Sequence, residues 1–313
     1  MSESVEEKLD KIPVINLLVR FLKQIKLPGF EGLSSYDLLE MYVLGIVKGA
    51  LTTRASAIAF SFFTAIFPFL LFIIIVIPYI PFDNFQNEFL AFLDSFLPPQ
   101  TSDFFNENIF ENISKNNQGG LLSTIFLLSL FLMANGVSAV FSGFEHSYHD
   151  QLTRSVFKQY LYALGVAIIL ALLVILTVGV LGYFEIYIME NLRDGGYIDD
   201  SQEQTGLVIA KYAFFVIMIY VSTATLYYFG TKEGKQSKFF SIGALLTTLL
   251  IIVTSYLFGV YIENFSKYNE LYGSIGALLI LLFYLWLNSN ILLLGFELNV
   301  SIKNLRQTHG KTD

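Results

Sequence analysis

Six long apolar stretches without a single charged residue constrain this chain more than any other feature of its sequence. A helix rises about 1.5 Å per residue, so about 20 apolar residues cross a hydrocarbon core of ~30 Å. Each stretch is long enough to do so, and together they predict six transmembrane helices. The stretches are Ala55–Phe82, Gly119–Phe144, Gln159–Phe184, Tyr212–Thr231, Phe239–Ile262 and Leu271–Phe296.

The chain as a whole carries too little charge to solvate a globular protein. Charged residues make up 14% of the 313 residues, whereas soluble domains usually carry about 25%. The alternative to a membrane protein, a large soluble core of buried helices, would need a polar shell that the sequence does not supply. We therefore expect an all-α fold, a polytopic membrane bundle of six transmembrane helices.

Lys and Arg residues are divided unevenly between the segments that connect these stretches. Fifteen lie before the first stretch, between the second and third, between the fourth and fifth, and after the last; four lie in the other connections. Because segments rich in Lys and Arg stay in the cytoplasm, both termini are expected to be cytoplasmic. Residues 83–118 are then expected on the outer side.

The remaining segments predict interfacial helices and no further domain. Residues 1–50 form a cytoplasmic or interfacial segment that contains a basic amphipathic helix, Val14–Lys26, suited to an anionic inner leaflet. Residues 51–300 form the transmembrane domain, and residues 301–313 form a cytoplasmic polar tail. Aromatic residues between 83 and 118 repeat at helical spacing, so this segment either lies flat on the membrane or packs over the bundle as a lid.

The sequence offers little material for catalysis. It contains no cysteine and three histidines, of which His146 and His149 share a predicted cytoplasmic loop without a third metal ligand. No phosphate-binding loop or nucleophile motif is present. Lys and Arg follow the membrane topology and are not arranged as a nucleic-acid-binding surface. We therefore expect a protein that is not an enzyme, with no metal, no cofactor and no nucleic-acid partner.

Polar residues in and beside the apolar stretches are the candidate functional residues, because burying them without partners is costly. Arg54 opens the first stretch and Glu297 follows the last, which places both charges at the same depth. They either pair across the bundle or face lipid headgroups. Asn135, Asn288 and Asn290 lie inside the second and sixth stretches, where amides either form hydrogen bonds between helices or contact a substrate.

Proline and glycine residues mark places where the helices bend or come close together. Pro68 and Pro78 are expected to kink or break the first helix and to free backbone carbonyls, as in helices that line transporter cavities. Small residues at the start of the sixth stretch permit either close helix packing or access to a pathway. The glycines expected at close contacts are Gly136, Gly273, Gly276 and Gly295.

Short motifs at both ends of the predicted bundle form a set. They are RASAIAF at Arg54–Phe60 with Phe67-Pro68, YGSIG at Tyr272–Gly276 followed by Trp286, and GFELN at Gly295–Asn299. Gly136, Tyr148 and Arg154 fit the same set, although Phe144-Glu145 stands where Leu-Asn is usual. In combination these residues resemble the YihY/BrkB virulence-factor family of bacterial inner-membrane proteins. The candidate polar residues are Arg54, Asn135, Glu145, Tyr148, Arg154, Tyr272, Asn288, Asn290, Glu297 and Asn299.

The resemblance implies a six-helix protein of the inner membrane. Some members of the family carry the name ribonuclease BN, which belongs to an unrelated metal-dependent nuclease, and three histidines without a metal motif argue against that activity here. The resemblance, with the polar residues above, implies a transporter or a protein that handles envelope lipids, with a cavity between helices for a small solute or a lipid. The alternative is a scaffold that transports nothing and binds envelope-assembly proteins.

Overall fold

The computed structural model describes residues 21–24, 34, 36, 50–76, 119–145, 155–230, 238–264 and 274–309. Six long helices, one over each predicted stretch, make up most of these residues. They are α4 (Ala50–Val76), α8 (Gly119–Glu145), α9 (Val156–Tyr183), α11 (Asp200–Gly230), α12 (Ile242–Asn264) and α14 (Ser274–His309). Five are long and apolar enough to cross a membrane, and α4 contributes a shorter apolar helix, Leu51–Ile66. The predicted all-α membrane bundle is confirmed.

The helices are longer than several of the stretches that predicted them. Helix α11 begins at Asp200, well before Tyr212, and α14 continues beyond Phe296 to His309. Helix α9 continues through a π-helical turn, η3 (Phe184–Met189), and α10 (Glu190–Asp194). A stretch without charges marks the part of a helix that suits lipid, whereas the backbone of a helix can continue through charged residues into water.

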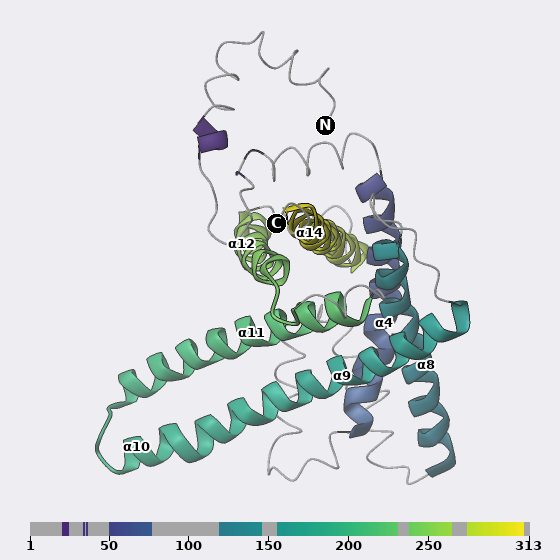
Figure 1. Cartoon of the computed structure of the whole chain (residues 1–313). Coiled ribbons are helices and arrows are strands. Elements are labelled where there is room, and N and C mark those ends of the chain that lie inside the picture. The colour runs from purple at the N-terminus through teal and green to yellow at the C-terminus, as the bar shows by residue number, and fades with distance from the viewer. Residues whose placement is uncertain are drawn as a thin grey trace.

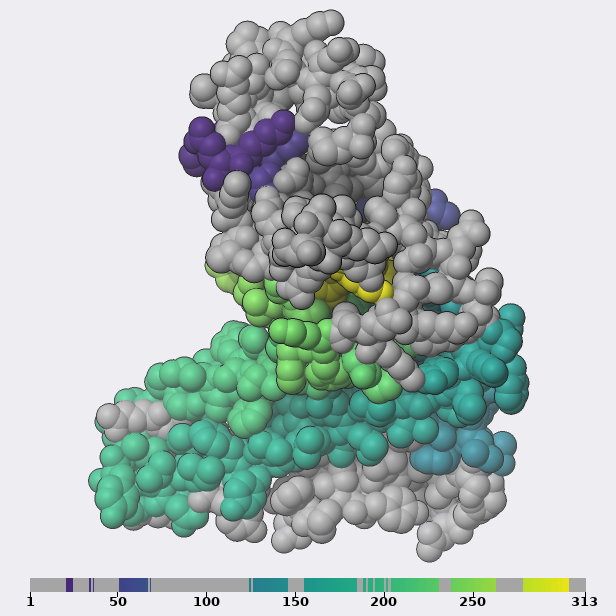
Figure 2. Space-filling model, viewed as in Figure 1, coloured from purple at the N-terminus to yellow at the C-terminus, as the bar shows by residue number. Residues whose placement is uncertain are grey.

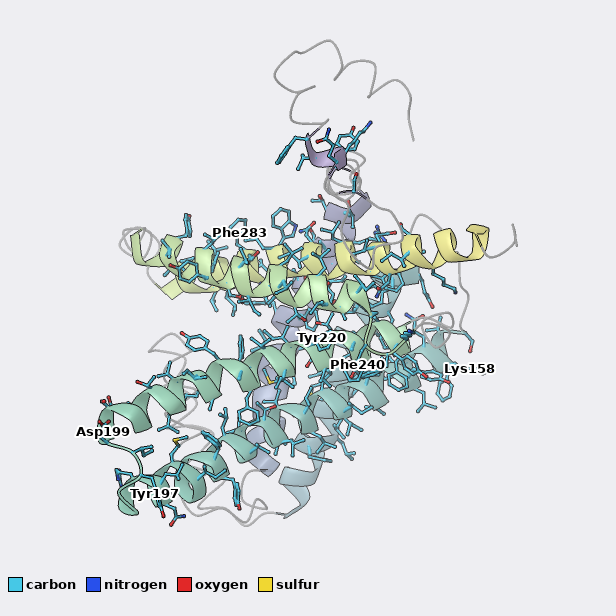
Figure 3. The ribbon with its side chains drawn as sticks, turned by 60° about the vertical axis from the view of Figure 1, so that its left-hand side comes forward. Lys158, Tyr197, Asp199, Tyr220, Phe240 and Phe283 are labelled. Atoms are coloured by element: carbon cyan, nitrogen blue, oxygen red, sulfur yellow. The ribbon has the colours of Figure 1, made fainter. Side chains whose placement is uncertain are left out.

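The six helices form a closed ring in chain order. Each helix packs against the next one, from α4 to α8, α9, α11, α12 and α14, and α14 returns to α4. Figure 1 shows three pairs, α4 with α8, α9 with α11 and α12 with α14, that cross one another. The hairpin of α9 and α11 reaches beyond α12 and α14 on one side (Figure 2). Lys158 lies at one end of this hairpin and Tyr197 and Asp199 at the other (Figure 3).

Apolar residues divide into a small buried core and a broad outer surface. Ile58, Phe141, Phe144 and Leu293 are among the largest side chains that are fully buried. Large apolar residues on the outer faces are exposed, among them Leu172 on α9 and others on α11 and α12. In water such a surface would bind other molecules, but in a bilayer it is the surface that lipid tails cover.

Helix α4 runs without interruption through Pro68, whose side chain is buried. The helix is therefore not broken at this residue, whereas the predicted kink stays a prediction. Proline removes one backbone hydrogen bond, and the packing of α4 against α8 and α14 stabilises the helix despite that loss.

Several predicted features lie outside the described residues. They are the amphipathic helix Val14–Lys26 apart from residues 21–24, the outer segment 83–118, Pro78, His146, Tyr148, His149, Arg154, Tyr272 and Gly273.

Candidate functional site

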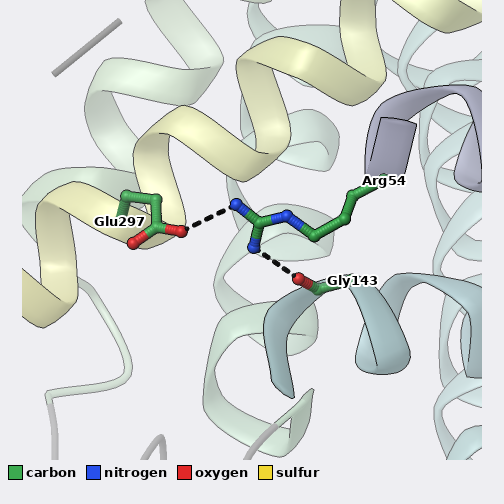
Figure 4. A network of polar contacts seen from close by, with 3 residues as sticks. All are labelled: Arg54, Gly143 and Glu297. Atoms are coloured by element: carbon green, nitrogen blue, oxygen red, sulfur yellow. Dashed lines mark hydrogen bonds and ion pairs between the residues drawn. The ribbon is translucent and has the colours of Figure 1, made fainter. Parts of the chain in front are cut away.

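Arg54 and Glu297 form an ion pair between the first and the last helix of the ring. Arg54 Nη2 donates to Glu297 Oε1 at 3.1 Å, and Arg54 Nη1 donates to the carbonyl oxygen of Gly143 in α8 at 2.9 Å (Figure 4). The two side chains are 14% and 11% exposed, so both charges are largely withdrawn from the surroundings of the protein. The predicted approach of the two charges is confirmed.

Gly143 makes this three-helix contact possible. It lies in the last turn of α8, where backbone carbonyls have no hydrogen-bond partner within the helix. A cation at this end of a helix also interacts favourably with the helix dipole. A Cβ atom at Gly143 would lie 2.7 Å from Cδ1 of Ile58 and 3.3 Å from Cδ2 of Leu293. Only a glycine lets α4 and α14 approach α8 this closely without displacing those side chains.

Tyr227 of α11 connects α12 to α14 inside the bundle. Its hydroxyl donates to the carbonyl oxygen of Leu292 at 2.7 Å and lies 2.6 Å from Oγ1 of Thr247. Because the Tyr227 hydroxyl donates its hydrogen bond to the carbonyl of Leu292, its oxygen accepts a hydrogen bond from the hydroxyl of Thr247. A Cβ atom at Gly295 would collide with Oγ1 of Thr247 and lie 2.6 Å from the hydroxyl of Tyr227. The glycine of the GFELN motif therefore makes room for a buried polar junction.

Phe296 and Asn299 provide the other contacts of this motif. The ring of Phe296 stacks on Phe144, with centroids 4.2 Å apart. Asn299 Nδ2 donates to Oγ of Ser241 at 2.8 Å, and Asn299 Oδ1 accepts from the backbone N–H of Gly243 at 2.8 Å. Ser241 Oγ also accepts a backbone N–H of the first turn of α12. Ser241 and Asn299 together cap the N-terminus of α12.

We call this meeting point the hub. It consists of Arg54, Gly143, Phe144, Tyr227, Thr247, Gly295, Phe296 and Glu297. It lies near the beginning of α4 and α12 and near the end of α8, α11 and α14.

The sixth helix, α9, joins next to the hub. Nε2 of Gln159, near the start of α9, donates to Oγ of Ser142 at 3.0 Å. Gly230, the last residue of α11, lies against the ring of Phe144. All the helix ends that the Lys and Arg count predicts to be cytoplasmic are thus on one side, as a bundle of alternating helices requires.

Within the described part of the chain, the three asparagines inside the predicted helices form no hydrogen bonds between helices. Asn135 is exposed. Asn288 Nδ2 and Asn290 Nδ2 each donate at 2.8 Å to a carbonyl one turn earlier in their own helix, of Tyr284 and Trp286 respectively. The carbonyl four residues back is the nearest acceptor for a short polar side chain in an apolar helix, and it takes the amide hydrogens.

Three further predicted residues lie on these helices. A Cβ atom at Gly136 would be 3.0 Å from the Cβ of Ala65, so α4 and α8 are close there. Glu145 is the last residue of α8, and Gly276 lies in the first turn of α14.

The sequence patterns did not point to Gly143, Tyr227, Ser241 or Thr247. One signal was available, because Gly136 and Gly143 are seven residues apart and so share a helix face. Hydroxyl residues such as Tyr227 and Thr247 gave no comparable signal, since the apolar stretches contain many of them.

Comparison with known proteins places this architecture in a family. A model of the family described as virulence factor BrkB matches residues 45–313. A Bacillus subtilis (strain 168) protein named ribonuclease-like protein YfkH is 26% identical over 254 residues, 79% of this chain and 88% of that protein. A UPF0761 membrane protein of Aggregatibacter aphrophilus (strain NJ8700) is 22% identical over 266 residues, 83% and 89% of the two chains. No solved structure is significantly similar.

The family match covers all six helices and every residue of the hub. This chain therefore belongs to the virulence factor BrkB family of membrane proteins.

Proposed function

We propose that this protein is a transporter of the bacterial inner membrane that moves a lipid or a small polar solute, and that it is not an enzyme. The observation that carries the proposal is the buried ion pair between Arg54 and Glu297, which joins the two helices that close the ring. Ionisable residues inside a membrane protein are costly and commonly belong to a transport pathway or to a contact that changes during transport.

A purely structural contact would not need charges at this place. Replacing a buried ion pair by apolar residues of similar size is often neutral or stabilising. An ion pair differs from an apolar contact in that it can exchange partners, for example with water or a polar ligand. The pair therefore suits a contact between α4 and α14 that opens and closes.

Orientation and location are part of the proposal. The fifteen-to-four division of Lys and Arg supports cytoplasmic termini and, with them, a hub near the cytoplasmic face. The ion pair would then control access to the interior of the ring from the cytoplasm. Membrane lipids are the surrounding medium and, under this proposal, one source of substrate.

Reconstitution into vesicles tests the proposal. Purified protein is placed in vesicles that contain a lipid with a fluorescent headgroup, and a membrane-impermeant quencher reports how fast the lipid changes leaflets. A second preparation, loaded with a small fluorescent solute, reports solute efflux. We expect the wild-type protein to accelerate one of the two, and Arg54→Ala to alter that rate. Lys158→Ala, an exposed site at the start of α9, is the matched control and should leave it unchanged.

The same assay can refute the proposal. Vesicles with folded wild-type protein that move neither lipid nor solute faster than protein-free vesicles would rule out transport. The scaffold function would then be the better explanation, and the ion pair would be a static contact.

A further inference from the structure

Asn288 has a buried acceptor atom that is not used. Its Oδ1 is buried and has no hydrogen-bond partner among the residues that the structure describes. The amide orientation is fixed, because Nδ2 donates to the carbonyl oxygen of Tyr284 at 2.8 Å. A buried acceptor without a donor is unfavourable, and buried polar groups in proteins are nearly always satisfied. The atom therefore needs a donor that the described residues do not supply.

The position of Asn288 relates it to other polar groups. It follows Tyr284 by four residues and precedes Gly295 by seven, so the three share one face of α14. That face packs on α12, since the Tyr284 hydroxyl lies 2.6 Å from Oγ of Ser255 and Gly295 contacts Thr247. We call this contact the α12–α14 seam. It comprises Ser241, which precedes α12, Gly243, Thr247 and Ser255 of α12, and Tyr284, Asn288, Gly295 and Asn299 of α14.

Asn288 lies near the middle of the membrane-spanning part of α14. That part is Leu278–Lys303, and ten residues of helix from Leu278 correspond to about 15 Å. The nine residues to Glu297 correspond to about 14 Å, and a hydrocarbon core is about 30 Å thick. At this depth neither bulk water nor a resting lipid headgroup supplies a donor. A donor that reaches Asn288 has to enter along the seam.

The chemistry of the seam favours a neutral donor. Its eight residues provide hydroxyls, amides and glycine backbone and no charged side chain. A cationic donor at Asn288 would lack a counter-charge there, since the carboxylate of Glu297 already binds Arg54. A hydroxyl group has no such need. It can donate to Asn288 Oδ1 and accept from the hydroxyl pair of Ser255 and Tyr284 one turn away.

We propose that Asn288, with Ser255 and Tyr284, forms a mid-membrane binding site for the hydroxyl group of a polyol, either a free polyol or the headgroup of a lipid such as phosphatidylglycerol. The proposal rests on the proposed transport function and specifies its substrate class. It makes Asn288 a ligand-binding residue and the outer half of the α12–α14 seam a part of the substrate path.

Thermal unfolding in lipid nanodiscs tests the site without a transport measurement. Phosphatidylglycerol is compared with phosphatidylethanol, which has the same charge and no headgroup hydroxyl. A third sample contains phosphatidylethanol and free glycerol. The wild-type protein is compared with Asn288→Leu, which removes the acceptor at similar volume. Asn290→Leu is the matched control, because Asn290 lies on the same helix and makes the same bond to its own backbone.

We expect the wild-type protein to unfold at a higher temperature with phosphatidylglycerol than with phosphatidylethanol. This difference should disappear in Asn288→Leu and persist in Asn290→Leu. Stabilisation by glycerol in phosphatidylethanol that also depends on Asn288 would identify a free polyol as the ligand. Stabilisation by phosphatidylglycerol alone would identify the lipid headgroup.

Two results would overturn the site. One is an Asn288→Leu variant that is as stable as the wild type, or more stable, in all three samples, which would show an acceptor that stays unoccupied. The other is a ¹³C-labelled Asn288 carbonyl whose infrared band shows the same hydrogen bond in all three samples, which would show a resident water. A headgroup effect that depends on Asn288, in a protein that moves neither lipid nor solute, would support the site while refuting transport.

Discussion

Removing one member of the Arg54–Glu297 pair should destabilise the protein more than removing both. Both side chains are nearly nine-tenths buried, and an unpaired charge left at such a site costs about 3–5 kcal/mol. The lower value corresponds to more than a hundredfold change in the folding equilibrium, since 1.4 kcal/mol is about tenfold. A double variant, Arg54→Met with Glu297→Leu, leaves no buried charge and should lie close to the wild type in its free energy of unfolding.

The contact with Gly143 predicts an asymmetry between the single variants. Arg54→Ala takes the donor away from both the carboxylate of Glu297 and the carbonyl oxygen of Gly143. Glu297→Ala leaves the guanidinium with the Gly143 carbonyl, so it should be the milder change. A charge swap should recover stability only in part, because a carboxylate at position 54 cannot donate to that carbonyl.

The assay is unfolding of the purified variants in one detergent, followed by the loss of monodisperse protein with temperature or denaturant. Lys158→Ala is the control and should change stability by less than about 0.5 kcal/mol, since its side chain is exposed. The reasoning fails if the two single variants behave like the control. It also fails if the effects of Arg54→Ala and Glu297→Ala simply add in the variant that carries both, because then the residues are not coupled.

Further predictions concern the packing, the topology and the chemistry. Gly295→Ala forces a methyl group against Thr247 and Tyr227 and should cost about 1–3 kcal/mol, measured by the same unfolding assay. Asn299→Ala should speed amide hydrogen exchange in the first turn of α12, which it caps. The chain has no native cysteine, so a cysteine at Ser201 should react with an impermeant reagent outside intact cells and one at Gln236 should not. Purified protein with Zn²⁺ or Mg²⁺ should leave RNA intact.

The helices could be predicted from the sequence, but their ends could not. Twenty apolar residues without a charge have few alternatives to a transmembrane helix. The length of an apolar stretch does not indicate where the helix ends outside the lipid. Asp200 starts α11 because an acidic residue is favourable at a helix N-terminus, and α14 continues through its polar last turns to His309 because polar residues form helix in water as well.

Only the charged residues of the site could be predicted from the sequence. Arg54 and Glu297 could be paired in advance, because two opposite charges at one depth on the first and last helix have a strong reason to meet. The role of Tyr227 depends on which faces of α11, α12 and α14 come together, and those faces are equally apolar in the sequence. Asn288 was among the candidates, but the sequence does not indicate that its amide binds the backbone of its own helix and leaves Oδ1 without a described donor.

The contacts along the α12–α14 seam differ in strength from one end to the other. At the hub end, Asn299 forms hydrogen bonds to Ser241 and Gly243. The backbones of the two helices also lie so close together at Gly295 that no side chain fits there. Toward the other end the two helices share the hydroxyl pair of Ser255 and Tyr284, and the ring of Phe258 lies 5.0 Å from that of Tyr284. Separating the helices there parts side chains that can rotate away, whereas separating them at the hub end also breaks a close backbone contact. An opening of the seam is therefore expected to start beside Asn288, where the unused acceptor lies, while the hub holds the helices together.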